Sequence, residues 1–368
     1  MPDSKHLAFR VIMPIDTPEE LRQHIELAIK IELSTIPPYL YAMYSLEDAG
    51  SVPALLIRSI VVEEMLHAAL ATNLLLAVGG RPDFRSTLYM PAYPCELSHH
   101  RPPLTLSLEP VSVGLVRDTF MRIEQPEAHD APAEPDEFET LGQFYHALEI
   151  GLEKMSSEFD LFADPQLGSQ LSDPRFYRPV TFDAEDSGGL IGITDLASAI
   201  EAIEIIVHQG EGLSEDRWAD PSHQELTHYH KLVQIVDGEH PLGTVRGFPS
   251  NPRTADYPQD VAIVSDLFNA VYRGLYLTMD RLFGGDGDQA RAVGVLYLLM
   301  ADVLVQVAGF LASVDLGDGK TAAPTFEIYE FRTDAPLREI KDLSEQAARL
   351  FPELSTVHEA LRGMSLIL

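Results

Sequence analysis

The sequence is poor in cysteine and in basic side chains. Its 368 residues include a single cysteine, Cys95, which excludes a framework of disulfide bonds within the chain. There are 26 lysine and arginine residues against 57 aspartate and glutamate residues, which gives a formal net charge of -31 and a pI near 4.6. Because nucleic acids and anionic membrane surfaces are polyanions, this charge argues against either as a partner.

The sequence also shows little sign of targeting or of membrane insertion. Residues 1–13 lack a long apolar run behind a basic start, so we expect no signal peptide and a cytoplasmic location. The stretch Val293–Val314 is apolar and long enough to span a bilayer, but Asp302 near its middle would cost about 2.5–3.5 kcal/mol on insertion scales. We expect instead a helix buried on all sides within a large helical domain, without contact to a membrane.

The most informative motif is a glutamate followed three residues later by a histidine. Glu64 and His67 lie in an apolar stretch, Ile60–Gly80, that has the composition of a buried helix. On a helix this spacing places both side chains on one face. A carboxylate and an imidazole are costly to bury unless something pairs with them, and a divalent metal ion is one such partner. A lone Glu-x-x-His also arises by chance, so the motif needs support from other helices.

The helix that precedes this motif is predicted over residues 17–47. It begins with an N-cap threonine and a proline, and Glu32 lies on or beside its apolar stripe. Pro37 and Pro38 remove two amide donors and predict a kink one turn beyond Glu32. The alternative is that the helix ends there, but the apolar period resumes after the prolines, which favours a kinked continuation.

The motif itself belongs to a second helix, predicted over residues 53–78 and ended by two glycines. Because only a short loop separates the two helices, we expect them to pack antiparallel. Glu32 and Glu64 then lie at similar distances from the loop. The two carboxylates are therefore expected to face each other.

Later helices offer further carboxylates. In the helix predicted over residues 136–162, helical spacing places Glu149 nearest the apolar face, although a boundary carboxylate paired with lysine or arginine is the alternative. In the helix predicted over residues 194–212, Glu204 and Glu211 lie along one side. Glycines flank Glu211 and weaken the helix by about 1 kcal/mol each, which indicates either a distorted turn at a site or a simple helix end.

The rest of the chain divides into an excursion and an extension. Residues 81–126 are rich in proline and predict a long irregular excursion with a short strand around 104–108. A histidine-rich helix over 221–236 completes a metal-binding bundle in residues 1–240, and residues 241–368 are expected to form a helical extension packed on it. Further helices are expected there over residues 260–283, 289–314 and 343–361.

Five motifs, in this order, resemble one known family. They are Glu32-Leu-Ser-Thr-Ile-Pro-Pro-Tyr-Leu-Tyr-Ala, Glu63-Glu-Met-Leu-His67, Gly142-Gln-Phe-Tyr145, Val207-His-Gln-Gly-Glu-Gly212 and Thr227-His-Tyr229. The family is the ferritin-like one that includes the iminophenylpyruvate dimer synthase domain of violacein-type and rebeccamycin-type bisindole biosynthesis. The resemblance covers roughly residues 17–240. It implies an all-α fold, namely a ferritin-like four-helix bundle with additional helices.

The resemblance also implies a metal site. Carried over residue by residue, it favours Glu32, Glu64, His67, Glu211 and His228, whereas Glu149 and Glu204 rest on helical spacing alone. These ligand types suit a divalent metal, iron first, with manganese or zinc as alternatives, and one or two ions. Position 207 is valine, so the helix over 194–212 lacks a Glu-x-x-His of its own. His208 or His228 would have to take that place at a second metal.

Three classes of function remain open. The resemblance implies a metal-dependent oxidoreductase, with non-haem iron, that acts on a small amino-acid-derived molecule such as an indole- or phenyl-derived imine. The second class is a metal-binding or iron-handling protein without an organic substrate. The third is a metal-free helical scaffold in which the glutamates and histidines pair with each other. Whether the chain forms a homo-oligomer is left open.

Overall fold

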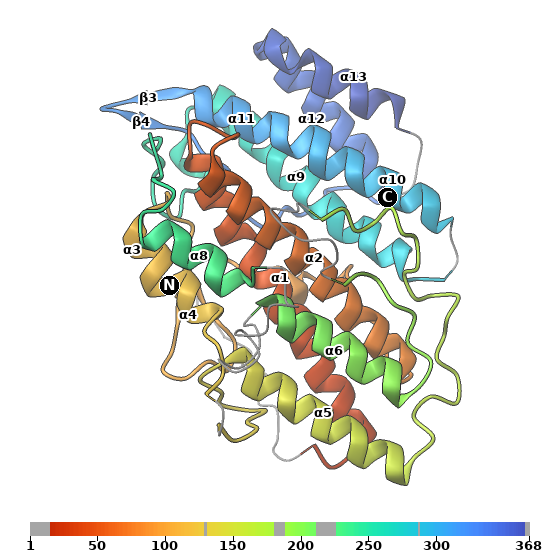
Figure 1. The fold of residues 1–368 in the computed structure, drawn as a ribbon. Helices are drawn as coiled ribbons and strands as arrows, with labels where there is room; N and C mark the ends of the chain where they lie inside the picture. Colours follow the sequence, from red (N-terminus) through yellow and green to blue (C-terminus); the bar gives the residue numbers. More distant parts are fainter. Residues whose placement is uncertain (1–14, 129–130, 180–187, 211–225, 286–287, 365–368) are drawn as a thin grey trace, which may run out of the picture.

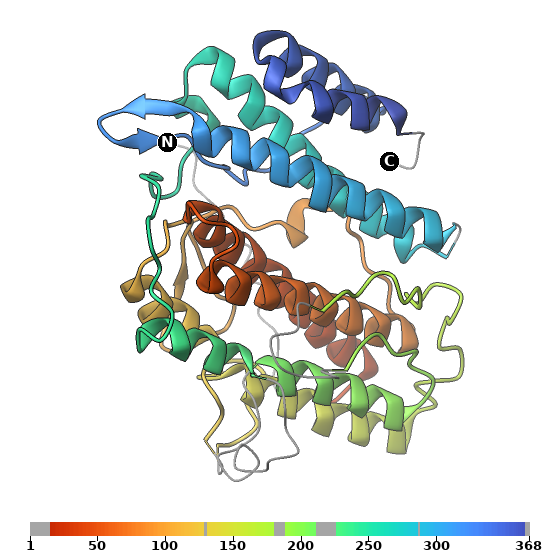
Figure 2. The same cartoon turned by 45° about the horizontal axis from the view of Figure 1, so that its top comes forward.

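The computed structural model describes residues 15–128, 131–179, 188–210, 226–285 and 288–364. These residues are mostly helical and pack in layers, with the two longest helices in the middle (Figures 1 and 2). The all-α expectation is therefore confirmed.

The central pair consists of α1 (Pro18–Ser45) and α2 (Val52–Ala77), which pack side by side along their length. The Thr17 side chain caps α1 by accepting a hydrogen bond from the Glu20 amide, as its sequence predicts. The helix continues through Pro37 and Pro38, which confirms the continuation. Nearly every residue of α2 is buried, because other helices cover both of its sides.

A four-helix bundle is completed by α5 (Leu141–Glu158) and α6 (Leu196–Gly210), which lie together on one side of the central pair (Figures 1 and 2). The capping box of Thr140 and Gln143 begins α5. The short helix α8 (His228–Val236) packs against α2 and α6 at one end of the bundle.

On the opposite side of the central pair lies the C-terminal part of the chain. It contains α9 (Gln259–Leu282) and a long helix formed by α10 (Gln289–Tyr297), a π-helical segment (Leu298–Leu304) and α11 (Val305–Ser313). The outermost layer packs on α9. It consists of α12 (Pro336–Leu350) and α13 (Ser355–Gly363), so the single helix expected over 343–361 is two helices.

The proline-rich excursion between α2 and α5 is also partly ordered by backbone pairing. Strand β1 (Cys95–Glu96) pairs antiparallel with β2 (Thr105–Leu106), where a short strand is predicted. A short helical run follows and packs against α8. It consists of α3 (Val113–Leu115), a π-helical segment (Val116–Phe120) and α4 (Met121–Ile123). A second hairpin, β3 (Asp315–Gly317) with β4 (Lys320–Thr321), is not foreseen by the sequence reading.

Within the part of the chain that the structure describes, two helices are long and apolar enough to cross a membrane by length and composition, which is weak evidence for a span. In α2 the most apolar window is 89% buried inside the protein, which is typical of a core helix. In Gln289–Ser313 the corresponding window is only 50% buried. The expectation of a helix buried on all sides is therefore wrong, because this helix lies at the edge of its layer and Val305 is 45% exposed.

One buried amide fixes the loop before α6 against α2. The Asn73 side chain donates to the carbonyls of Leu171 and Ile191, at 2.9 and 3.1 Å, and accepts from the Leu171 amide at 2.8 Å. Asn73 and Leu171 are fully buried, so the amide and carbonyl of Leu171 have no access to water as an alternative partner.

We expect Asn73→Ala to destabilise the protein by about 2–4 kcal/mol, because it leaves buried loop groups without partners. The matched control is Thr72→Ala at the same depth, where the lost hydroxyl donates to Ala68 of the same helix. We expect the control to cost less than about 1.5 kcal/mol. Urea unfolding measures both values, and equal losses would contradict a role for Asn73 in holding the loop.

Candidate metal centre

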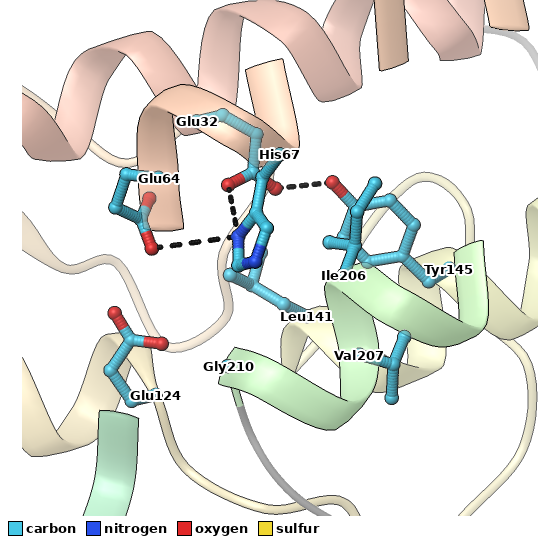
Figure 3. A pocket seen from close by; sticks show the side chains of 9 residues that line it. All are labelled: Glu32, Glu64, His67, Glu124, Leu141, Tyr145, Ile206, Val207 and Gly210. Atoms are coloured by element: carbon cyan, nitrogen blue, oxygen red, sulfur yellow. Dashed lines mark hydrogen bonds and ion pairs between the residues drawn. The ribbon is translucent and has the colours of Figure 1, made fainter. Parts of the chain in front are cut away.

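Three buried side chains from the central pair meet where the bundle and α8 come together. Glu32 lies on α1, and Glu64 and His67 lie one turn apart on α2. His67 Nδ1 is 3.4 Å from Glu32 Oε2 and 3.8 Å from Glu64 Oε1 (Figure 3). The three side chains are 1–3% exposed, and the facing carboxylates predicted from the sequence are thus brought together.

A second group shares Glu64. His228, the first residue of α8, places Nδ1 at 3.1 Å from Glu64 Oε1 and 3.3 Å from Glu124 Oε2. Glu124 directly follows α4, so this carboxylate comes from the excursion and not from a bundle helix. In each group the ligand atoms lie within 4.8 Å of one another, which is close enough for one ion to contact all three. Glu64 is the residue that the two groups have in common.

Each carboxylate of the cluster accepts a hydrogen bond from a hydroxyl. Tyr145 donates to Glu32 Oε1, Tyr39 to Glu124 Oε1 and Thr35 to Glu64 Oε2. The other oxygen of every carboxylate faces a histidine Nδ1. One oxygen is thus fixed by the protein, while the other is directed at the interior of the cluster, where a cation would bind.

The imidazoles are oriented in the same way. The far nitrogen of His67, Nε2, lies 2.9 Å from Gln209 Oε1, and that of His228 lies 2.8 Å from Glu63 Oε2. An oxygen acceptor at Nε2 requires the proton there, which leaves Nδ1 as the lone-pair nitrogen of a neutral ring. Both rings therefore direct a ligand atom towards the carboxylates.

The electrostatics of the cluster favour cations. Burial and the neighbouring Glu32 and Glu124 carboxylates raise the pKa of Glu64 from 4.5 to about 7. Burial lowers the pKa of His228, but Glu124 and the other facing carboxylates outweigh it and raise this pKa well above 6.5. Protons thus balance the charges when no cation is bound. A divalent ion would displace them, because metal ligands bind in their deprotonated forms.

A small cavity adjoins these side chains. Its volume is about 20 Å³, which holds one water molecule or an ion. The acidic side is formed by Glu32, Glu64 and Glu124, and the opposite side is mainly apolar (Figure 3). The other lining residues are His67, Leu141, Tyr145, Ile206, Val207 and Gly210.

Two of the other predicted ligands, Glu149 and Glu204, lie away from this cluster. Glu149 is half-buried and Glu204 is exposed, and neither belongs to the two groups found among the described residues. The side of α6 that lines the cavity carries Ile206 and Val207 and not Glu204. Glu211 lies outside the described residues.

The sequence reading missed Glu124, although a usable signal was present. Val116, Phe120 and Ile123 form the buried side of the short helical run, and Glu124 follows Phe120 by one turn. The same helical-spacing argument that singled out Glu32 would have found it. It was missed because the run is too short to show a repeated apolar face.

The family model for ferritin-like proteins matches residues 25–237, more than half of the chain. The chain belongs to the ferritin-like family. The match includes most of α1 and all of α2, α5, α6 and α8, which are the helices that surround the candidate metal centre.

Two similar proteins extend this comparison. A dichlorochromopyrrolate synthase from Lentzea aerocolonigenes is 24% identical over an alignment of 391 positions, which covers 86% of this chain and 36% of the relative. The chain thus spans little more than a third of the length of this curated relative. The crystal structure of a ferritin-like protein from Caulobacter vibrioides has a TM-score of 0.59 and 25% identity, and covers 84% of this chain and 100% of its own.

Metal analysis of variants tests the two groups of ligands. We expect the purified wild-type protein to bind two divalent ions per chain, Glu64→Ala to lose both, and Glu124→Ala to lose one. Glu149→Ala is the matched control and is expected to keep both ions. Elemental analysis gives the stoichiometry. A wild-type protein without stoichiometric metal would instead favour the scaffold interpretation.

The raised pKa of Glu64 predicts that chelator-treated protein loses stability as the pH rises. Folded protein keeps this proton up to about pH 7, whereas an unfolded chain releases it near 4.5. The protonated Glu64 therefore contributes on the order of 3 kcal/mol to the free energy of unfolding below pH 4.5. This contribution declines above pH 4.5 and is lost once the pH passes about 7. Urea unfolding across this range measures the decline. Glu64→Gln stays neutral and should flatten it, so an equal decline in this variant would refute the prediction.

Proposed function

We propose that this protein is a metal-dependent oxidoreductase of the ferritin-like type that acts on a small amino-acid-derived molecule. The observation that carries the proposal is the pair of buried ligand groups that share Glu64. Three carboxylates and two imidazoles in one buried cluster are a costly arrangement for a protein whose only need is packing. They become favourable when cations bind between them.

The donor set suits iron, with manganese or zinc as alternatives. Carboxylate and imidazole ligands without thiolate are typical of non-haem iron and manganese sites in helical bundles. A bound iron pair would supply the oxidation–reduction chemistry, with oxygen or peroxide as the electron acceptor. Glu32 and His67 would hold one ion, Glu124 and His228 the other, and Glu64 both.

Residues around this centre hold its ligands in place and limit the access of water. Tyr145 and Tyr39 hold the outer carboxylates through their hydroxyl groups, so the ligands keep their orientation when protons leave the cluster. Burial and the nearby carboxylates raise the pKa of Tyr39 well above 10, so its proton stays on the phenol. Ile206 and Val207 form an apolar wall that limits the access of water.

The substrate class is inferred from the synthase relative. Its name describes a synthase of a chlorinated aromatic product, and the alignment covers most of this chain. In a reaction of that class, two indole- or phenyl-derived imines would be joined as enamines by a new carbon–carbon bond. The two electrons and two protons released would pass to oxygen or peroxide.

An iron-handling role without an organic substrate is the second candidate. The observation in its favour is the cavity volume of about 20 Å³, which accommodates an ion or water but not an aromatic ring. A protein of this kind would oxidise ferrous iron with oxygen at the same rate whether or not an imine is present.

Oxygen uptake distinguishes these two functions. We expect protein loaded anaerobically with ferrous iron to consume oxygen faster when an aromatic imino acid is generated in the same solution by an amino-acid oxidase, after subtraction of the oxidase's own uptake. Val207→Phe narrows the cavity beside the apolar wall. We expect it to slow the imine-dependent oxygen uptake by about tenfold or more, while oxidation of iron alone continues. Ile200→Phe, on the same helix but away from the cavity, is the matched control. An oxygen-uptake rate that is the same with and without the imine would support the iron-handling role.

A further inference from the structure

Two oppositely charged side chains are buried behind His228, outside the lining of the cavity. Lys231 Nζ donates to both oxygens of Glu63, at 2.8 and 2.6 Å, and both side chains are only 1–2% exposed. A buried ion pair of this kind is seldom more stable than well-packed apolar residues, because both charges lose their hydration. Packing alone therefore does not account for it.

The geometry connects this pair to the metal centre through one imidazole. Glu63 and Glu64 are neighbours on α2, and a helix directs adjacent side chains about 100° apart. His228 lies between them, with Nδ1 at 3.1 Å from Glu64 Oε1 and Nε2 at 2.8 Å from Glu63 Oε2. Lys231 follows His228 by one turn of α8, so the same face of that helix delivers both.

We propose that Glu63 and Lys231 are positioning residues for His228. Glu63 accepts a hydrogen bond from Nε2–H and so leaves Nδ1 to face Glu64 and Glu124, while Lys231 holds the Glu63 carboxylate in place. This inference rests on the proposed metal centre. It assigns to this ion pair the task of orienting the ligand at one of the two metal positions.

The two metal positions are consequently unequal. His67 is held by the neutral amide of Gln209, whereas His228 is held by a carboxylate. A carboxylate at the far nitrogen makes an imidazole a more basic ligand, and loss of such a partner typically weakens metal binding about 10–100-fold. The position formed by Glu64, Glu124 and His228 is therefore the tighter of the two.

Cobalt(II) titration of the chelator-treated protein tests this inference without relying on activity. Competition with a chelator gives the affinity of each step, and the visible absorption of cobalt reports its ligands. The wild type should bind in two steps. The double variant Glu63→Leu with Lys231→Met removes both charges and the acceptor but keeps apolar packing, and should weaken the tighter step about 10–100-fold and alter its spectrum. Gln209→Leu should weaken only the other step.

A second double variant, Glu63→Gln with Lys231→Met, restores an acceptor oxygen and should recover the wild-type spectrum of the tighter step, with part of its affinity. Unchanged affinity and spectrum in both double variants would overturn the inference while leaving the metal centre intact. The inference would also be overturned if both binding steps weakened equally and the metal-depleted protein melted at a lower temperature. That is the behaviour of a purely structural ion pair. A wild type that binds no stoichiometric cobalt would overturn the proposed centre itself.

Discussion

The structure depends on how the Glu64 carboxylate is accommodated inside a helical core. Glu64 is 3% exposed, lies near the Glu32 and Glu124 carboxylates, and faces the imidazole of His228 at 3.1 Å. Such a concentration of negative charge is stable only beside protons or metal cations. Helices α1 and α2, the end of the excursion and the start of α8 all converge on this carboxylate. Their packing sets the distances at which a cation can replace the protons.

The second group of candidate ligands draws on segments outside the four-helix bundle. In this chain α6 supplies Gln209 as a hydrogen-bond partner of His67, and Ile206 and Val207 as an apolar wall. The carboxylate opposite Glu32 comes from Glu124 in the excursion, and the second imidazole comes from α8. The excursion is therefore part of the candidate site and not only a cover for one end of the bundle.

Much of this arrangement could be predicted from local sequence. Helical spacing placed Glu64 and His67 on one face, and a short loop set Glu32 opposite them. The cap and the apolar period also gave the bounds of the first helices to within a few residues. Helical spacing did not suffice for Glu149 and Glu204, because it gives the positions of side chains around a helix but not which side of the helix faces the centre. Glu124 was overlooked because the helical run before it has only a few turns, too few to show a repeated apolar face.

The sequence by itself determined the helical class, the acidic character, and the pairing of Glu32 with Glu64 and His67, because each of these depends on periodicity or on short connections. Only the tertiary structure decided which distant segments complete the cluster. Glu124 and His228 are 104 positions apart along the chain, and no local rule relates them. The same holds for Glu63, whose neighbour Glu64 faces the centre while Glu63 itself meets Lys231. The different partners of Glu63 and Glu64 follow from how α8 packs on α2, a long-range contact that residue spacing does not encode.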